Sequence, residues 1–80
     1  MSRKVVIYHK AYCPYCRGVI NHLKDNEIPF EAIDVTTKPK LYKQLKEEYD
    51  HHTVPMIFID DEFIGGSEDF YENYSDKLTG

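Results

Sequence analysis

The only two cysteines of the chain lie close together, in the stretch KAYCPYCR of residues 10–17. Cys13 and Cys16 are separated by a proline and a tyrosine, and a cation stands on either side of the pair, at Lys10 and Arg17. A thiol reacts as its thiolate, so the chemistry of such a pair depends on which sulfur loses its proton more readily. The pair can be a structural disulfide, half of a metal site, or the reactive group of a redox protein.

The local structure predicted around the pair makes its two thiols unequal. Pro14 suits the first turn of a helix, where its missing N–H would have no partner, so Cys13 is expected at a helix N-terminus. The unpaired N–H groups and the positive end of the helix dipole favour a thiolate there. Lys10 and Arg17 add positive charge and are predicted to tune the pKa of this thiol. We expect Cys13 to be exposed and to act as the nucleophile.

Cys16 lies one turn inside the predicted helix and is expected to keep its proton longer. It can donate its S–H to the sulfur of Cys13. A thiol in this place can also attack a mixed disulfide on Cys13 and close an internal disulfide. The pair therefore predicts reversible thiol-disulfide exchange, with Cys16 as the resolving thiol.

The two other interpretations of the pair are weaker. A disulfide that closes so short a loop restrains the unfolded chain little. The apolar run behind the first cations is too short for a signal peptide, which predicts a cytoplasmic protein whose thiols stay reduced. A zinc site would need two more ligands, and the candidates His51 and His52 are adjacent, so their side chains would point apart in extended chain.

The overall composition bounds the remaining function classes. Eighty residues, 41% hydrophobic and 30% charged, suit one small soluble domain spanning residues 1–80. The formal net charge of −4 argues against nucleic-acid binding, which needs clustered Lys and Arg. No stretch is long enough to span a bilayer. We expect a monomer that binds neither nucleic acid nor membrane.

Hydrophobic runs and turn residues predict the element order β-α-β-α-β-β-α. Strands are expected over residues 4–8, 30–35, 56–59 and 63–64, and helices from Pro14, from just before Pro39, and from Ser67. The first strand is apolar enough to be central and buried on both faces. We expect an α/β fold with a four-stranded mixed sheet and three helices, in which the first β-α-β half is parallel and the terminal hairpin antiparallel.

Helix caps and buried positions give finer predictions. Thr36 or Thr37 is expected to cap the second helix and Ser67 the last one. In the second strand, burial is expected for Phe30, Ala32, Ile33 and Val35. The apolar faces of the two later helices would consist of Leu41, Leu45 and Tyr49, and of Phe70, Tyr71, Tyr74 and Leu78.

Three stretches, in this order, make the chain resemble a glutaredoxin. The CPYC sequence of residues 13–16 matches the dithiol active-site motif of that family. The TVP sequence of residues 53–55 and the GGSED sequence of residues 65–69 resemble its TVP segment and its GG-x-[DE]-D turn. The resemblance runs from about Lys4 to Leu78 and implies a thioredoxin-like fold, in line with C-x-x-C beside a β-α-β pattern.

The resemblance also implies a binding site for glutathione as co-substrate. In the family the proline matching Pro55 is cis, and the backbone of Val54 pairs with the cysteinyl part of glutathione. Lys10 and Tyr15 would lie near the glycyl carboxylate and the sulfur. The start of the last helix would hold the γ-glutamyl end, with Glu68 or Asp69 receiving its ammonium. The full set implied to bind glutathione is Lys10, Tyr15, Thr53, Val54, Pro55, Gly66, Ser67 and Glu68.

The implied activity is glutathione-dependent reduction of protein disulfides and glutathione mixed disulfides, a role in electron transport and cell redox homeostasis with no metal expected. The protein partners would carry disulfides or glutathione adducts, as ribonucleotide reductase does. One alternative is a carrier of a [2Fe-2S] cluster held between two protomers and two glutathiones, which the rigid ring of Pro14 disfavours. Another is a hydrogen donor reduced by thioredoxin reductase, which the anion site of residues 66–68 disfavours.

Two residues depart from the family pattern. Tyr42 stands where members often carry Arg or Gln, and a tyrosine cannot form the same bidentate pair with a carboxylate. Either Lys38 or another lysine substitutes, or glutathione binds more weakly at that end. Tyr12 stands where a smaller polar residue is common, and we expect it to narrow the entrance.

Overall fold

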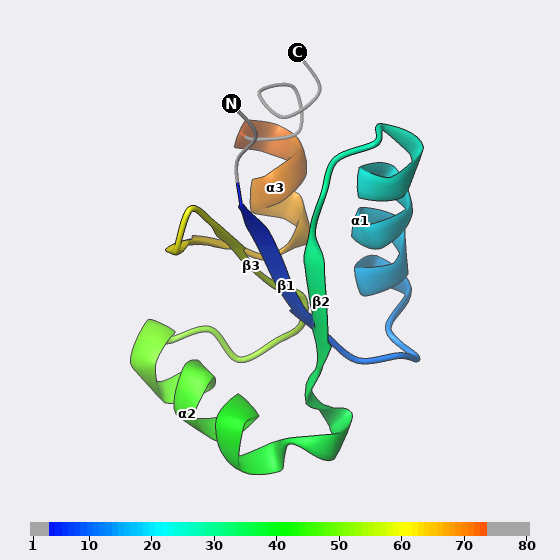
Figure 1. Cartoon of the computed structure of the whole chain (residues 1–80). Helices are drawn as coiled ribbons and strands as arrows, with labels where there is room; N and C mark the ends of the chain where they lie inside the picture. Colours follow the sequence, from blue (N-terminus) through cyan, green and yellow to red (C-terminus); the bar gives the residue numbers. More distant parts are fainter. Residues whose placement is uncertain (1–3, 74–80) are drawn as a thin grey trace.

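Helices cover both faces of one mixed sheet in the computed structural model, which describes residues 4–73 (Figure 1). The elements are β1 (Val5–His9), α1 (Pro14–Asp25), β2 (Glu31–Asp34), η1 (Val35–Thr37), α2 (Pro39–Tyr49), β3 (Met56–Ile59), β4 (Glu62–Gly65) and α3 (Ser67–Asn73). The sheet has four strands in the order β2-β1-β3-β4. The predicted fold class and element order are confirmed. Within the described residues, no helix has the length and apolar character needed to cross a bilayer.

The central strand β1 positions everything else in the fold. It runs parallel to β2 and antiparallel to β3, and β3 in turn pairs antiparallel with β4. Successive side chains of a strand point to opposite faces, so Val5 and Ile7 enter one hydrophobic cluster while Val6 enters the other. The residues of β3 divide in the same way and all four are buried. The expected burial of the first strand on both faces is confirmed.

The face of the sheet under α1 and α3 is mostly aliphatic, and we call it the aliphatic face. Val19 and Leu23 of α1 and Phe70 of α3 have no exposed surface. The buried cluster consists of Val5, Ile7, Val19, Leu23, Ile28, Ile57, Ile59 and Phe70. The helix that begins at the cysteine pair is therefore held by a closed core.

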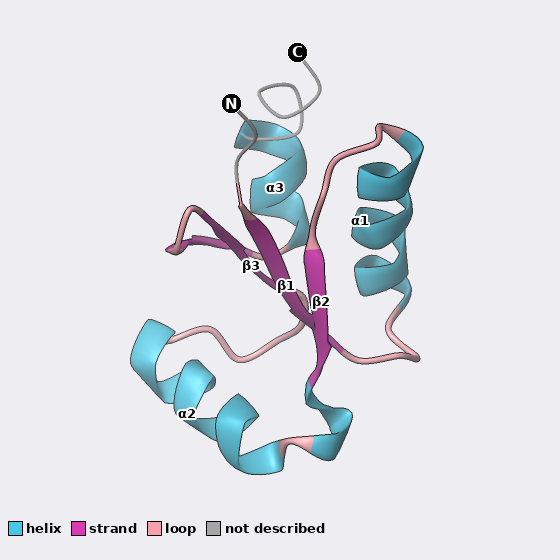
Figure 2. Cartoon of the chain, in the orientation of Figure 1, coloured by secondary structure: helices cyan, strands magenta, loops and turns pink. Residues whose placement is uncertain are grey.

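The other face carries α2 (Figure 2). Its cluster is rich in aromatic residues, and we call this face the aromatic face. Leu45 is buried here, while Leu41 and Tyr49 are half-buried, so the predicted stripe of α2 is confirmed. The ring of Tyr49 lies 5.1 Å from that of Phe58 and 4.9 Å from that of Phe63, measured between ring centres. The aromatic rings on this face of the sheet therefore pack against one another.

The second strand and the caps differ from the predictions. Ala32 is exposed, because β2 is an edge strand of the sheet. Val35 is buried, but it belongs to the short 3₁₀ helix η1. Thr36 and Thr37 also lie in η1, where the carboxylate of Asp34 accepts the Thr36 N–H at 2.8 Å. Neither threonine caps α2, whose N-cap is Lys38 without a side-chain bond.

The last helix begins with a different cap from the one expected. Ser67 is its first residue, and the carboxylate of Asp69 reaches back to accept the N–H of Gly66 at 3.1 Å. A side chain at the third helical position can satisfy the cap N–H in this way. Phe70 is buried as predicted, whereas Tyr71 is 45% exposed. The other two residues predicted for this face, Tyr74 and Leu78, lie outside the described residues.

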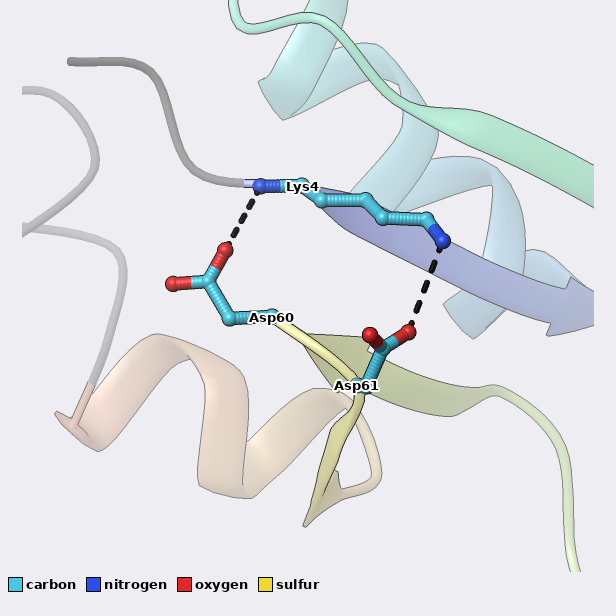
Figure 3. Close-up of polar contacts among 3 residues, drawn as sticks. All are labelled: Lys4, Asp60 and Asp61. Carbon is cyan, nitrogen blue, oxygen red and sulfur yellow. Dashed lines mark hydrogen bonds and ion pairs between the residues drawn. The ribbon is translucent and has the colours of Figure 1, made fainter.

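The turn between β3 and β4 is fixed to the start of β1 (Figure 3). Asp60 and Asp61 both have positive φ, of 52° and 68°, as a two-residue hairpin loop requires. The backbone N–H of Lys4 donates to the Asp60 carboxylate at 2.9 Å, and its ammonium lies 3.4 Å from Asp61. Because Glu62 already pairs with Ile59, β4 begins one residue before the predicted start.

Candidate active site

Cys13 is the N-cap residue of α1. Its backbone is extended, with φ −83° and ψ 116°, and Pro14 follows as the first residue of the helix. The sulfur of Cys13 accepts the backbone N–H of Cys16 at 3.4 Å. The predicted placement at the helix start is confirmed, and the acceptor at this cap is a sulfur in place of the usual oxygen.

The expected exposure of Cys13 is wrong, since only 9% of its surface is accessible. Its sulfur faces the backbone of a segment that comes much later in the chain. The thiol donates to the carbonyl of Val54, with 3.9 Å between sulfur and oxygen. The Val54–Pro55 peptide bond is cis, as the resemblance implied. The sulfur is therefore bounded by the helix start on one side and by residues 54 and 55 on the other.

Cys16 has no exposed surface, and both thiols are free. Burial, helped by a hydrogen bond with the side chain of Cys13, raises the pKa of the Cys16 thiol to about 12. This direction agrees with the expectation that Cys16 keeps its proton. A buried thiol behind a more accessible one has the arrangement that a resolving cysteine needs.

A cavity of about 970 Å³ opens over Cys13. Every residue that the resemblance implied for glutathione binding lines it: Lys10, Tyr15, Thr53, Val54, Pro55, Gly66, Ser67 and Glu68. These residues come from the start of α1, the segment before β3 and the start of α3. Neither Cys16 nor Arg17 is among the lining residues, and Arg17 is exposed. The influence of Lys10 and Arg17 on the thiol stays a prediction.

One wall of the cavity carries positive charge. The ammonium of Lys10 lies 4.7 Å from the ring centre of Tyr42, and that of Lys46 lies 4.4 Å from the same centre. The Tyr42 hydroxyl donates to the carbonyl of His52 at 3.5 Å. Neither Lys46 nor Lys38 is among the lining residues, although Lys46 approaches the Tyr42 ring.

The start of α3 forms another wall of the same cavity. Gly65 has φ +115°, a conformation that L side chains rarely adopt, and a side chain there would collide with the carboxylate of Asp69. The N–H of Gly66 is engaged by that carboxylate. A bound anion would therefore have to meet the later N–H groups of this turn, beside the acidic side chains of Glu68 and Asp69.

His51 and His52 line the cavity, although the sequence analysis considered them only as zinc ligands and not as part of a glutathione site. Nε2 of His51 lies 3.3 Å from the Thr53 hydroxyl, while Nε2 of His52 lies 3.2 Å from the Asp50 carboxylate. Their position in the sequence could have indicated a place in the site, because both histidines directly precede the TVP segment of residues 53–55. The exposed rings of Tyr12 and Tyr71 also line the cavity. Within residues 4–73, no group of three or more His, Cys, Asp or Glu is placed to hold a metal ion.

The family model described as Glutaredoxin matches residues 5–64, which include both cysteines and the cis proline. The chain belongs to the glutaredoxin family. A glutaredoxin from Pseudomonas aeruginosa is 36% identical over 67 residues, which cover 84% of this chain and 80% of that protein. The crystal structure of glutaredoxin 1 from Francisella tularensis superimposes with a TM-score of 0.79 at 31% identity, covering 99% of this chain and 100% of that one. The thioredoxin-like fold is thus confirmed.

The similar glutaredoxins include a monothiol protein. Monothiol glutaredoxin-S7 from rice is 35% identical over 72 residues, which cover 84% of this chain but 43% of that protein. The present chain, in contrast, has both cysteines of the C-x-x-C motif, Cys13 and Cys16. Family membership supports an oxidoreductase activity in general.

Proposed function

We propose that this glutaredoxin is a glutathione-dependent thiol-disulfide oxidoreductase, with Cys13 as nucleophile and Cys16 as resolving thiol. The observation that carries the proposal is the position of Cys13 in the wall of a cavity that all the residues implied for glutathione binding also line. The second thiol lies directly behind it and is fully buried. Nucleophile, resolving group and binding surface are therefore in one place.

The first step is exchange at the sulfur of Cys13. Its thiolate attacks one sulfur of the substrate disulfide, the new bond forms as the old S–S bond breaks, and the leaving thiolate takes a proton. The N–H of Cys16, 3.4 Å from this sulfur, stabilises the negative charge on the attacking thiolate. When the group on Cys13 is glutathione, a second glutathione attacks its sulfur, releases the Cys13 thiolate and leaves as oxidised glutathione. When it is a protein, Cys16 attacks the sulfur of Cys13, releases the protein thiol and closes an internal disulfide, which two glutathiones then reduce as they form oxidised glutathione.

The cavity gives glutathione a defined direction. Its glycyl carboxylate would lie toward Lys10, its cysteinyl backbone along Val54, and its ammonium toward Glu68. In the free protein the Val54 carbonyl accepts the thiol of Cys13. A thiolate cannot donate, so ionisation of Cys13 releases this carbonyl to accept an N–H from the bound peptide. Activation of the nucleophile and formation of the binding surface are thereby coupled.

We also propose that the protein works in the cytoplasm, on proteins that carry disulfides or glutathione adducts. The mechanism begins from free thiols, which a reducing compartment maintains. Exposed rings at the cavity, Tyr12 at 69% and Tyr15 at 70% accessibility, offer apolar surface to such a protein. Ribonucleotide reductase is one substrate of this kind.

The test is a coupled assay with glutathione, NADPH and glutathione reductase, and a glutathione mixed disulfide as substrate. Cys13→Ser should abolish turnover, whereas Cys16→Ser should retain it, since glutathione itself can cleave the mixed disulfide on Cys13. On a protein disulfide both variants should fail, because that reaction needs two electrons. Equal loss of mixed-disulfide turnover in both variants would show that the roles are wrong.

Two further outcomes of the same assay separate the alternatives. Turnover supported by thioredoxin reductase in place of glutathione would identify a hydrogen donor of the other type. A stable two-iron chromophore after anaerobic reconstitution, together with negligible reductase activity, would identify a cluster carrier. Either result would replace the proposed function.

A further inference from the structure

The ring of Tyr42, a residue that lines the cavity, lies against the ammonium groups of Lys10 and Lys46. Lys10 comes from the segment between β1 and α1, and Lys46 from the next turn of α2. Both ammonium groups lie within 5 Å of the same ring centre, at 4.7 and 4.4 Å, well inside the range of cation–π attraction. A single side chain thus fixes cations from two separate elements.

We propose that Tyr42 is a positioning residue that holds Lys10 at the cavity wall to bind a substrate carboxylate, and that Lys46, which does not line the cavity, adds positive charge from its place over the same ring. The inference rests on the proposed function, because the carboxylate is assigned to the glycyl end of glutathione. It supplies a role for the tyrosine that stands in place of the more common Arg or Gln. The arrangement replaces one planar guanidinium by two ammonium groups on one ring.

A lysine needs such support more than an arginine does. Its ammonium is a point charge on a flexible four-carbon stem, so much rotamer freedom is lost when it is fixed against a ligand. An ammonium that lies against a ring face keeps N–H donors directed away from the ring. Because Lys10 itself lines the cavity, donors held in this way are available to a bound carboxylate. The ring therefore reduces the entropy that Lys10 loses when the substrate binds.

The ring of Tyr42 is itself held on two sides. It packs, half-buried, against the cluster of the aromatic face that contains Leu45. Its hydroxyl donates to the carbonyl of His52, at a long distance of 3.5 Å. Packing is therefore the main restraint, and the ring can be removed while the apolar contact is kept.

Tyr42→Leu tests the role of the ring, since leucine keeps apolar contact and lacks the π face. The KM for glutathione should rise about two- to fivefold, the range that an exposed cation–π contact supports, while kcat changes little. The matched substrate is glutathione with its glycyl carboxylate converted to a carboxamide, for which the KM should stay near the wild-type value. Tyr42→Phe is the conservative variant: it keeps the ring, so its KM for glutathione should lie near the wild-type value.

Lys46→Met tests the second cation on the same substrates. The KM for glutathione should rise about twofold, and added salt should diminish the difference from wild type, because screened charges attract less. Lys43→Met is the matched control on the same helix, since Lys43 is exposed and is not one of the two lysines that lie over the Tyr42 ring. Its KM should equal that of the wild type.

An unchanged KM in Tyr42→Leu, or an equal rise for glutathione and its carboxamide, would overturn the inference. In either case normal turnover by the wild type would leave the proposed function standing. If the wild type turned over neither form of glutathione, the proposed function would fail and the inference with it. Equal effects of Lys46→Met and Lys43→Met would also refute the role of Lys46.

Discussion

The two faces of the sheet are built from the same alternating strands and are filled in different ways. On the aliphatic face, Val19, Leu23 and Phe70 are completely buried. On the aromatic face Met56 is also completely buried, but Leu45 and Phe58 retain 7% and 8% accessibility, and half-buried rings pack around them. This face also keeps a second, smaller cavity of about 280 Å³. One face is closed and the other is partly open.

The two faces support different parts of the site: one supports the reactive thiols and the other supports residues proposed to bind the substrate. The helix that carries both thiols is held by the aliphatic face, so the geometry of the C-x-x-C pair depends on a closed core. Tyr42, which lines the cavity and lies against Lys10, belongs to α2 on the aromatic face, as does Lys46. Substitutions on α2 can therefore alter substrate preference at small cost to the thiols. The following predictions test this division, from the largest expected effect to the smallest.

Truncation of one phenylalanine on each face should give unequal losses of stability. Phe70→Ala removes a completely buried ring and should lower the free energy of unfolding by about 3–5 kcal/mol. Phe63→Ala removes a half-buried ring of the aromatic face and should cost about 1–2 kcal/mol. Urea denaturation followed by circular dichroism measures both values. Equal losses would show that the two faces are equally well packed.

The buried thiol on the aliphatic face should make the stability of the reduced protein fall at alkaline pH. Burial raises the pKa of Cys16 from its ordinary value of 9.0 to about 12, so the unfolded chain releases this proton first as the pH rises. The contribution is complete below about pH 9 and is lost progressively toward pH 12, at no more than about 1.4 kcal/mol per pH unit. Denaturation at a series of pH values should show this fall.

Cys16→Ser provides the control for the alkaline loss, because a serine hydroxyl does not titrate in that range. The variant should lose less stability than the wild type between pH 9 and pH 12. Parallel curves for the two proteins would show that other groups, such as Tyr71, whose pKa burial also raises, account for the whole effect.

The smallest effect is expected where the aromatic face opens to solvent. Lys4 and Asp61 line the smaller cavity and form an ion pair at 3.4 Å, with side-chain accessibilities of 62% and 82% (Figure 3). Lys4→Met should lower the free energy of unfolding by no more than about 0.5 kcal/mol, since exposed pairs contribute little. The backbone bonds between Lys4 and Asp60 stay in place. A larger loss that salt abolishes would mean that the pair is stronger than its exposure indicates.

The strands, the helices and the placement of Cys13 at a helix start could be predicted because they depend on local sequence. The continuous apolar run of β1, the proline after Cys13 and the four-residue spacing of the α2 stripe each act within a few neighbouring residues. The same holds for the apolar run of β3. The exposure of Ala32 was missed because the position of β2 at the sheet edge depends on strand order.

The features that the sequence could not reveal arise from contacts between distant segments. Cys13 is buried because its thiol meets the carbonyl of Val54, 41 positions away. Lys10 reaches Tyr42 across a similar gap in the chain. The capping role of Asp69 depends on how the backbone leaves β4 at Gly65. The resemblance to glutaredoxins predicted which residues line the cavity, whereas the contacts among these residues became visible only in the structure.

The sulfur cap of α1 links the chemical state of Cys13 to the backbone of its neighbour. Protonation, alkylation or a mixed disulfide at that sulfur alters its strength as an acceptor for the Cys16 N–H. The amide resonance of Cys16 should therefore move with every such change. The active site thus contains its own spectroscopic reporter, readable in a ¹⁵N-labelled sample without any added probe.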